Sequence, residues 1–103
     1  MPALLVIRAV ISDPAKRAAF DDWYRREHLA NAMKVFGAEK AWRFWSDTDP
    51  SAHQATYQVA DRAAAEAALN STEMKALIAK FDRAWPGIPR AREVLTLVEE
   101  RAA

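Results

Sequence analysis

The stretch Ala3–Ile11, which reads ALLVIRAVI, decides the fold because both of its faces are apolar. Its content of Val, Ile and Leu is typical of a β-strand, in which successive side chains point to opposite faces. Leu5 and Ile7 share one face, and Leu4 and Val6 share the other. A strand with one solvated face would instead alternate apolar with polar residues. We therefore expect both faces of this strand to be covered.

A helical region follows this strand. Asp13 is suited to be the N-cap of a helix whose first residue is Pro14. The helical periodicity places Leu29 on the polar side, which indicates that the helix bends or breaks just after His28. A short further turn is expected to end at Gly37.

The remainder of the chain predicts a hairpin, a second helical region and a last strand. Asp61 is suited to cap an Ala-rich helix that restarts at 70–71 and ends at the prolines of 86–89. Alternating or apolar runs predict the remaining strands over 38–46, 53–60 and 92–99.

The order of these elements, β-α-β-β-α-β, predicts an α+β, ferredoxin-like subunit with a four-stranded antiparallel sheet and two helices on one face. Two helices leave the other face of the sheet open. Large aromatic residues nevertheless occur on both faces of the second strand, with Trp42 and Phe44 on one and Trp45 on the other. An open apolar face is more often a partner site than a solvated surface. We therefore expect a homodimer in which the two sheets pack face to face.

Composition excludes several classes of protein. The chain of 103 residues, 51% hydrophobic and 28% charged, is expected to form a single domain over 1–103. A net charge of +1 gives no basis for nucleic-acid binding, and no apolar run is long enough for a membrane span or signal peptide. Without cysteine and with only two histidines, no metal site is expected. We expect a soluble, cytoplasmic protein.

The candidate chemistry lies in Phe20–Leu29, which reads FDDWYRREHL. Tyr24 and His28 are four residues apart on a helix and can touch, and Glu27 adjoins both. A carboxylate beside an imidazole orients it as a general acid or base, and a tyrosine can donate to a developing oxyanion. The alternative is structural, with Tyr24 in the core and His28 stabilising a helix C-terminus.

The opposite side of this helix carries four charged residues, Asp21, Asp22, Arg25 and Arg26. Asp21 precedes Arg25 by four residues, and Asp22 precedes Arg26 by four. This orientation of acid before base is the favourable one for ion pairs on a solvated helix face. We expect these four residues to face solvent.

The same stretch resembles the F-x-x-W-Y-x-x-E-H-L signature of the dimeric α/β-barrel superfamily, and of its EthD-like branch in particular. The resemblance implies a ferredoxin-like subunit, a homodimer that forms a β-barrel, and one pocket per subunit lined by Trp23, Tyr24 and His28. Relatives often have proline where this chain has Ala30, and Pro-Gly where it has Phe36-Gly37. Both departures affect the loop after the signature, and so the shape of the pocket.

Other residues are weaker candidates for the pocket. Arg8 interrupts an apolar strand and either binds a substrate carboxylate or, as we favour, pairs with Glu27 across the helix–sheet interface. Trp42 and Tyr57 are candidate aromatic walls for a substrate, with the core or the dimer interface as the alternative. His53 is interpreted as an ordinary strand-edge residue. The superfamily includes haem-dependent monooxygenases, but the two histidines do not favour a haem here, and no cofactor is expected.

Two functions are compatible with this constellation. In the first, a cofactor-free isomerase, cyclase or oxidative enzyme acts on an aromatic or carbonyl compound, with His28 as proton shuttle, Glu27 as its orienter and Tyr24 as hydrogen-bond donor. In the second, a non-catalytic binding or accessory homodimer holds a small hydrophobic or aromatic ligand in the same pocket. The sequence contains no phosphate-binding loop or serine triad signature that would favour another chemistry.

Overall fold

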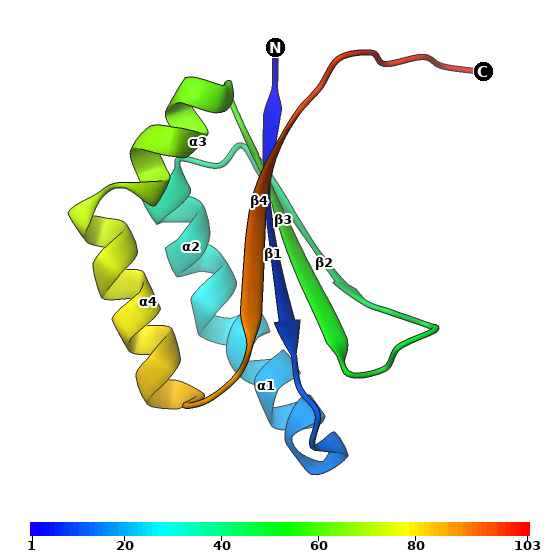
Figure 1. The fold of residues 1–103 in the computed structure, drawn as a ribbon, viewed down its shortest axis with the longest axis vertical. Helices are drawn as coiled ribbons and strands as arrows, with labels where there is room; N and C mark the ends of the chain where they lie inside the picture. The colour runs from blue at the N-terminus through cyan, green and yellow to red at the C-terminus, as the bar shows by residue number, and fades with distance from the viewer.

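Four antiparallel strands form one sheet, and all helices pack against one of its faces, as Figure 1 shows for the computed structural model of residues 1–103. The order of the strands across the sheet is β2-β3-β1-β4. The strands are β1 (Ala3–Val10), β2 (Lys40–Trp45), β3 (Ala52–Val59) and β4 (Arg90–Thr96). The helical segments are η1 (Pro14–Lys16), α1 (Arg17–Trp23), η2 (Tyr24–His28), α2 (Leu29–Phe36), α3 (Arg62–Leu69) and α4 (Thr72–Ala84).

This arrangement confirms the ferredoxin-like fold predicted from the order of the elements. The central pair, β1 and β3, is flanked by β4 and β2, and every neighbouring pair is antiparallel. The core lies between the sheet and the helices. It contains the alternate side chains of β1 and β3 that point towards the helices, among them Leu5, Ala9, Ala55 and Tyr57.

Short polar side chains begin the helices where the sequence predicts them. Asp13 accepts a hydrogen bond from the backbone of Ala15 at 2.9 Å, and Asp61 accepts one from Ala64 at 2.8 Å. Ser71 restarts the second helical region as the N-cap of α4. These caps satisfy backbone N–H groups that have no partner within the helix.

Periodicity indicates a bend or a break just after His28, and of these the break is wrong, because the first helical region is continuous there. Residues Tyr24–His28 form a π-helical turn, η2, and the chain continues directly into α2. The wider turn changes the angular position of every later residue. Leu29 is consequently half-buried against the core rather than on the polar side. Gly37 ends α2 in the left-handed conformation at φ 63°, as predicted.

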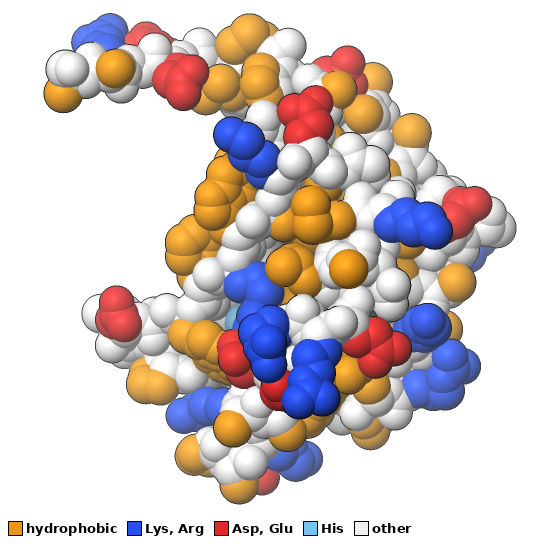
Figure 2. Space-filling model, turned by 180° about the vertical axis from the view of Figure 1, so that it is seen from behind, with side chains coloured by type: hydrophobic (Ala, Val, Ile, Leu, Met, Phe, Trp, Pro, Cys, Tyr) orange, Lys and Arg blue, Asp and Glu red, His pale blue; other side chains and the backbone are white.

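The face of the sheet opposite the helices is open. Trp42 and Phe44 of β2 are 40% and 51% exposed on this face, and Leu95 of β4 is 44% exposed. Figure 2 shows the molecule hollowed on this side, between the C-terminal tail and the rest of the chain, with hydrophobic side chains along the hollow. The tail leaves the sheet after Leu97, whose N–H donates to the carbonyl of Pro2 at 2.9 Å.

None of the helices combines the length and the apolar character that crossing a bilayer requires.

Candidate functional site

An apolar cavity of about 310 Å³ lies on the helix side of the sheet, between α4, η2 and the strands β1 and β4. A volume of this order is at the lower end of the range for small-molecule sites. Its apolar walls come from β1, α4 and the segment before β4: Ile7, Met74, Leu77, Ile78, Phe81 and Ile88.

Tyr24 and His28 contribute the polar atoms of the inner wall of this cavity. Both belong to the π-helical turn η2, and their ring centroids lie 4.7 Å apart. Trp23 stacks on His28, with centroids 4.7 Å apart and planes 23° apart. Single π-helical turns occur frequently at functional sites. The turn therefore makes these residues candidates on grounds separate from the sequence pattern.

His28 is neutral at physiological pH. Burial, together with the positive charges of Arg90 and Lys80, lowers its pKa to about 4. A neutral imidazole keeps one nitrogen lone pair that can accept a proton. The same ring also lines a polar cleft on the outer surface, beside Glu27 and Lys80. His28 thus separates the apolar cavity from a solvated cleft.

Tyr24 is joined to Tyr57 of β3 by a buried hydrogen bond between their hydroxyl groups, 2.9 Å long. Burial raises the pKa of Tyr24 to about 12, and it also raises the pKa of Tyr57. Both phenols therefore remain protonated at neutral pH. Tyr57, predicted as a possible wall, lies fully buried behind Tyr24 and does not line the cavity.

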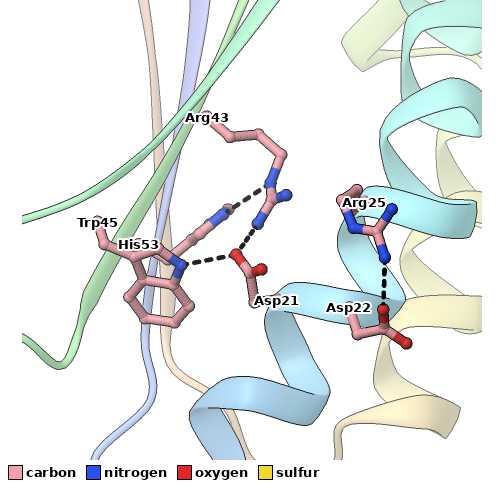
Figure 3. Close-up of polar contacts among 6 residues, drawn as sticks. All are labelled: Asp21, Asp22, Arg25, Arg43, Trp45 and His53. Carbon is pink, nitrogen blue, oxygen red and sulfur yellow. Dashed lines mark hydrogen bonds and ion pairs between the residues drawn. The ribbon is translucent and has the colours of Figure 1, made fainter.

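A polar network of four side chains, Asp21, Arg43, Trp45 and His53, is shown in Figure 3. Two of its members, Arg43 and His53, lie beside the ring of Tyr24. The carboxylate of Asp21 on α1 accepts hydrogen bonds from Arg43 and, at 2.8 Å, from the indole of Trp45. Arg43 in turn donates from Nε to Nε2 of His53 at 3.2 Å. The guanidinium carbon of Arg43 also lies 5.3 Å from the centre of the Tyr24 ring.

The network fixes the protonation of its members. The hydrogen bond that Asp21 accepts from Trp45 lowers the pKa of this carboxyl group below its usual range, and the hydrogen bond from Arg43 lowers it further. Burial, together with the charge of Arg43, lowers the pKa of His53 to about 4. Because Nε2 of this neutral ring accepts from Arg43, its proton lies on Nδ1.

Sequence reasoning missed this network. The interpretation of His53 as a strand-edge residue is wrong, because β3 lies between β2 and β1 and its ring is buried beside Tyr24. The expected pair of Asp21 with Arg25 is also absent. Asp22 instead pairs with Arg25 at 2.8 Å and with Arg26 at 3.1 Å. One feature of the sequence points to this network: Arg43, a charged residue, shares the inward face of β2 with Trp45.

Besides Tyr57, four of the predicted site residues do not line the cavity. Trp23, which stacks on His28, lines the outer cleft instead. Glu27 is exposed in the outer cleft, and no hydrogen bond joins it to His28. Arg8 lies on the open face, where it donates to Gln54 at 2.9 Å and pairs with Glu93 at 3.2 Å. The expected pair of Arg8 with Glu27 is therefore wrong, because the side chain of Arg8 points away from the helices. Trp42 is on the same open face.

The structure thus brings together Trp23, Tyr24 and His28, with Tyr57 behind them. No group of three or more His, Cys, Asp or Glu side chains is placed to hold a metal ion.

Comparison with solved structures places this geometry in a known fold. The chain is similar over 98% of its length to an EthD family protein from Bacillus halodurans C-125, covering 100% of that chain at 20% identity and a TM-score of 0.67. It is similar over 96% to SnoaB, a cofactor-independent oxygenase from Streptomyces nogalater, covering 95% of that chain at 15% identity and a TM-score of 0.70. The chain has their fold.

A third structure of the same fold was solved with a ligand. It is a monooxygenase from Streptomyces coelicolor in complex with nanaomycin D, similar over 98% of this chain and 91% of its own at 16% identity, with a TM-score of 0.71. The sequence itself matches no family model and no curated protein. The resemblance of the Phe20–Leu29 stretch to the EthD-like branch is confirmed at the level of the fold.

Proposed function

We propose that the protein is an enzyme that removes a proton from a small aromatic or carbonyl compound bound in the apolar cavity. The observation that carries this proposal is the pairing of a neutral histidine, His28, with a protonated phenol, Tyr24, on the wall of that cavity. It is supported by the printed descriptions of two structures of the same fold, an oxygenase that is cofactor-independent and a monooxygenase with a bound ligand.

In the proposed step, His28 accepts the proton from a carbon next to a carbonyl group. The C–H bond breaks, an N–H bond forms on the imidazole, and the electron pair moves to the carbonyl oxygen to give an enolate. Tyr24 accepts a hydrogen bond from Tyr57 and donates its own hydrogen to this oxygen. Protonation at another carbon completes an isomerisation, attack on a second carbonyl completes a cyclisation, and reaction with dioxygen gives an oxidation.

The low pKa of His28 is compatible with this role as a base. Its causes are burial and the charges of Arg90 and Lys80, which oppose the imidazolium ion. An enolate next to the ring adds an opposite charge, which favours the protonated form and raises the pKa. The proton can then leave through the solvated cleft that His28 also lines.

Exchange of carbon-bound hydrogen tests this step without knowledge of the product. We would follow the loss of the benzylic α-proton signal of 2-tetralone in D₂O by NMR, with the wild type and with His28→Gln. The wild type is expected to accelerate exchange, and His28→Gln to remove at least about 100-fold of that acceleration. Tyr24→Phe is expected to slow it by about tenfold through loss of one hydrogen bond. Arg26→Gln, on the solvated face, is the control.

Full exchange by a folded His28→Gln variant would contradict the role of His28. Circular dichroism of each variant separates loss of the fold from loss of the base.

A second candidate is a non-catalytic protein that binds the same class of ligand. One observation favours it: no carboxylate orients the His28 ring, because Glu27 lies in the outer cleft without a hydrogen bond to it. This candidate predicts that 2-tetralone binds to the wild type and exchanges no faster than in buffer.

We also propose that the protein is a homodimer joined through the open face of the sheet. Trp42, Phe44 and Leu95 are exposed there beside polar neighbours such as Gln54, and a second sheet would cover them. The hollow on this face is open in the single chain (Figure 2).

A further inference from the structure

Besides His28, two arginines interrupt the apolar lining of the cavity. Arg90 and Arg92 lie on β4, two residues apart and therefore on the same face of the strand. Arg92 is directly opposite Ile7 in the register of β1 and β4, and Ile7 also lines the cavity. Because cross-strand partners point to the same face, Arg92 belongs to the helix side of the sheet, at the cavity.

The two guanidinium groups differ in their partners. Arg90 pairs with Asp82 of α4 at 2.5 Å and lies 4.0 Å above the centre of the Phe81 ring. Arg92 takes part in none of the ion pairs of the structure. Arg90 is thus held in place as part of the wall, whereas Arg92 is a cation without an anion beside an apolar cavity.

A guanidinium group in this position suits one kind of ligand. Its planar pair of N–H donors matches a carboxylate in a bidentate hydrogen-bonded pair. Arg92 is exposed at the edge of the cavity, so water partly screens such a pair, but the pair still favours an anion over a neutral group of the same shape. Lys80, in the adjoining cleft, adds positive charge on the far side of His28.

We propose that the cavity is specific for hydrophobic carboxylates, with the apolar ring of the ligand against Leu77 and Phe81 and its carboxylate on Arg92. From the sequence, Arg8 was an alternative candidate to bind a substrate carboxylate. In the structure it is paired with Glu93 on the opposite face of the sheet. The inference rests on the proposed function only in using the same cavity, and it names the class of compound that enters it.

A pair of probes with the same shape and different charge tests this inference. We would titrate the full chain at pH 7 with 1-naphthoate and with 1-naphthamide by isothermal calorimetry. The variants are Arg92→Gln, Arg92→Lys and, as a control of equal charge change, Arg62→Gln on the outer surface of α3. Ile78→Trp is included to fill the mouth of the cavity.

The wild type is expected to bind 1-naphthoate more tightly than 1-naphthamide. Arg92→Gln should weaken naphthoate binding by about tenfold and leave naphthamide binding within about twofold, as expected for one charge-assisted pair. Arg92→Lys should give an intermediate loss, because a lysine does not form the bidentate pair. Arg62→Gln should change neither affinity, and Ile78→Trp should weaken both.

Three results would overturn the inference. Equal affinity of the wild type for both probes would leave the cavity as a binding site and remove its preference for carboxylates. Naphthoate binding that survives Ile78→Trp and depends on Arg92 would place the anion outside the cavity. Failure of both probes to bind the wild type would contradict the proposed function as well as this inference. Equal binding of both probes would contradict this inference alone, so the two failures can be distinguished.

Discussion

The fold changes the ionisation of both histidines within the pH range of ordinary experiments. Burial lowers the pKa of His28 and of His53 to about 4, compared with 6.5 in an unfolded chain. As the pH falls below 6.5, the two histidines become protonated in the unfolded chain. In the native protein they become protonated only near pH 4. The free energy of unfolding therefore decreases with falling pH in this window, and recovers as the pH rises.

We expect this effect to remove about 2 kcal/mol per histidine between pH 7.5 and pH 5. Urea unfolding at fixed protein concentration measures it. His28→Gln, which cannot titrate, should lose about half of the decrease due to the histidines. An unchanged pH dependence in that variant would show that His28 has the same pKa in the native and unfolded states, and so that burial does not lower it.

The hydroxyl pair of Tyr24 and Tyr57 is expected to stabilise the protein. Tyr24→Phe or Tyr57→Phe leaves one buried hydroxyl without its partner, at a cost of about 1–2 kcal/mol each. The double variant should cost less than the sum, with a coupling energy of about 1 kcal/mol. Additive effects would indicate that the hydroxyl groups do not interact. Unfolding of the four proteins by urea provides this double-mutant cycle.

At the scale of elements, Asp21 joins α1 to β2 through Arg43 and Trp45. Its neighbour Asp22 contacts only arginines of its own helical region, as Figure 3 shows for Arg25. We expect Asp21→Asn to lower the free energy of unfolding by about 1.5 kcal/mol, because it leaves the mostly buried Arg43 without its anion. Asp22→Asn should change it by less than about 0.5 kcal/mol. Equal effects would contradict a role for Asp21 in joining the two elements.

The elements also show what the sequence predicts and what it does not. Caps such as Asp61, and the glycine that ends α2, depend on neighbouring residues alone, so local chemistry predicts them. The π-helical turn has more residues per turn than an α-helix, so periodicity at a constant angle per residue cannot predict it. The partner of Asp21 lies on β2, more than 20 positions along the chain, and only the assembled sheet brings it near.

The candidate site was predictable to the same extent. Trp23, Tyr24 and His28 are near in sequence, and helical spacing brings them together. Arg8 and Trp42 were predicted as pocket residues, which requires them to lie on the faces of their strands that meet the helices. Because these strands are apolar on both faces, the sequence does not show which face meets the helices. His53 was missed because its neighbours come from three separate elements.

At the scale of the whole molecule, the open face of the sheet determines the expected assembly. A second copy covering Trp42 and Phe44 would give particles of twice the chain mass in sedimentation velocity. Phe44→Glu places a charge in that interface, and we expect it to shift the protein to the monomer. Ala67→Glu, on the exposed side of α3, should leave the dimer intact. A wild-type monomer at tens of micromolar would contradict the proposed assembly.

The central claim is that a neutral His28 faces a cavity that takes an aromatic ligand. Its most direct test is a ¹⁵N–¹H NMR spectrum of the histidine side chains at pH 7, recorded during titration with 1-naphthoate and assigned with His28→Gln. We expect the nitrogen shifts of a neutral imidazole for His28, and a progressive change of these signals with ligand. The signals of His53, which is enclosed by the network around Asp21, should move much less. An imidazolium pattern for His28 in the free protein, or signals that stay fixed while the ligand binds, would contradict the account.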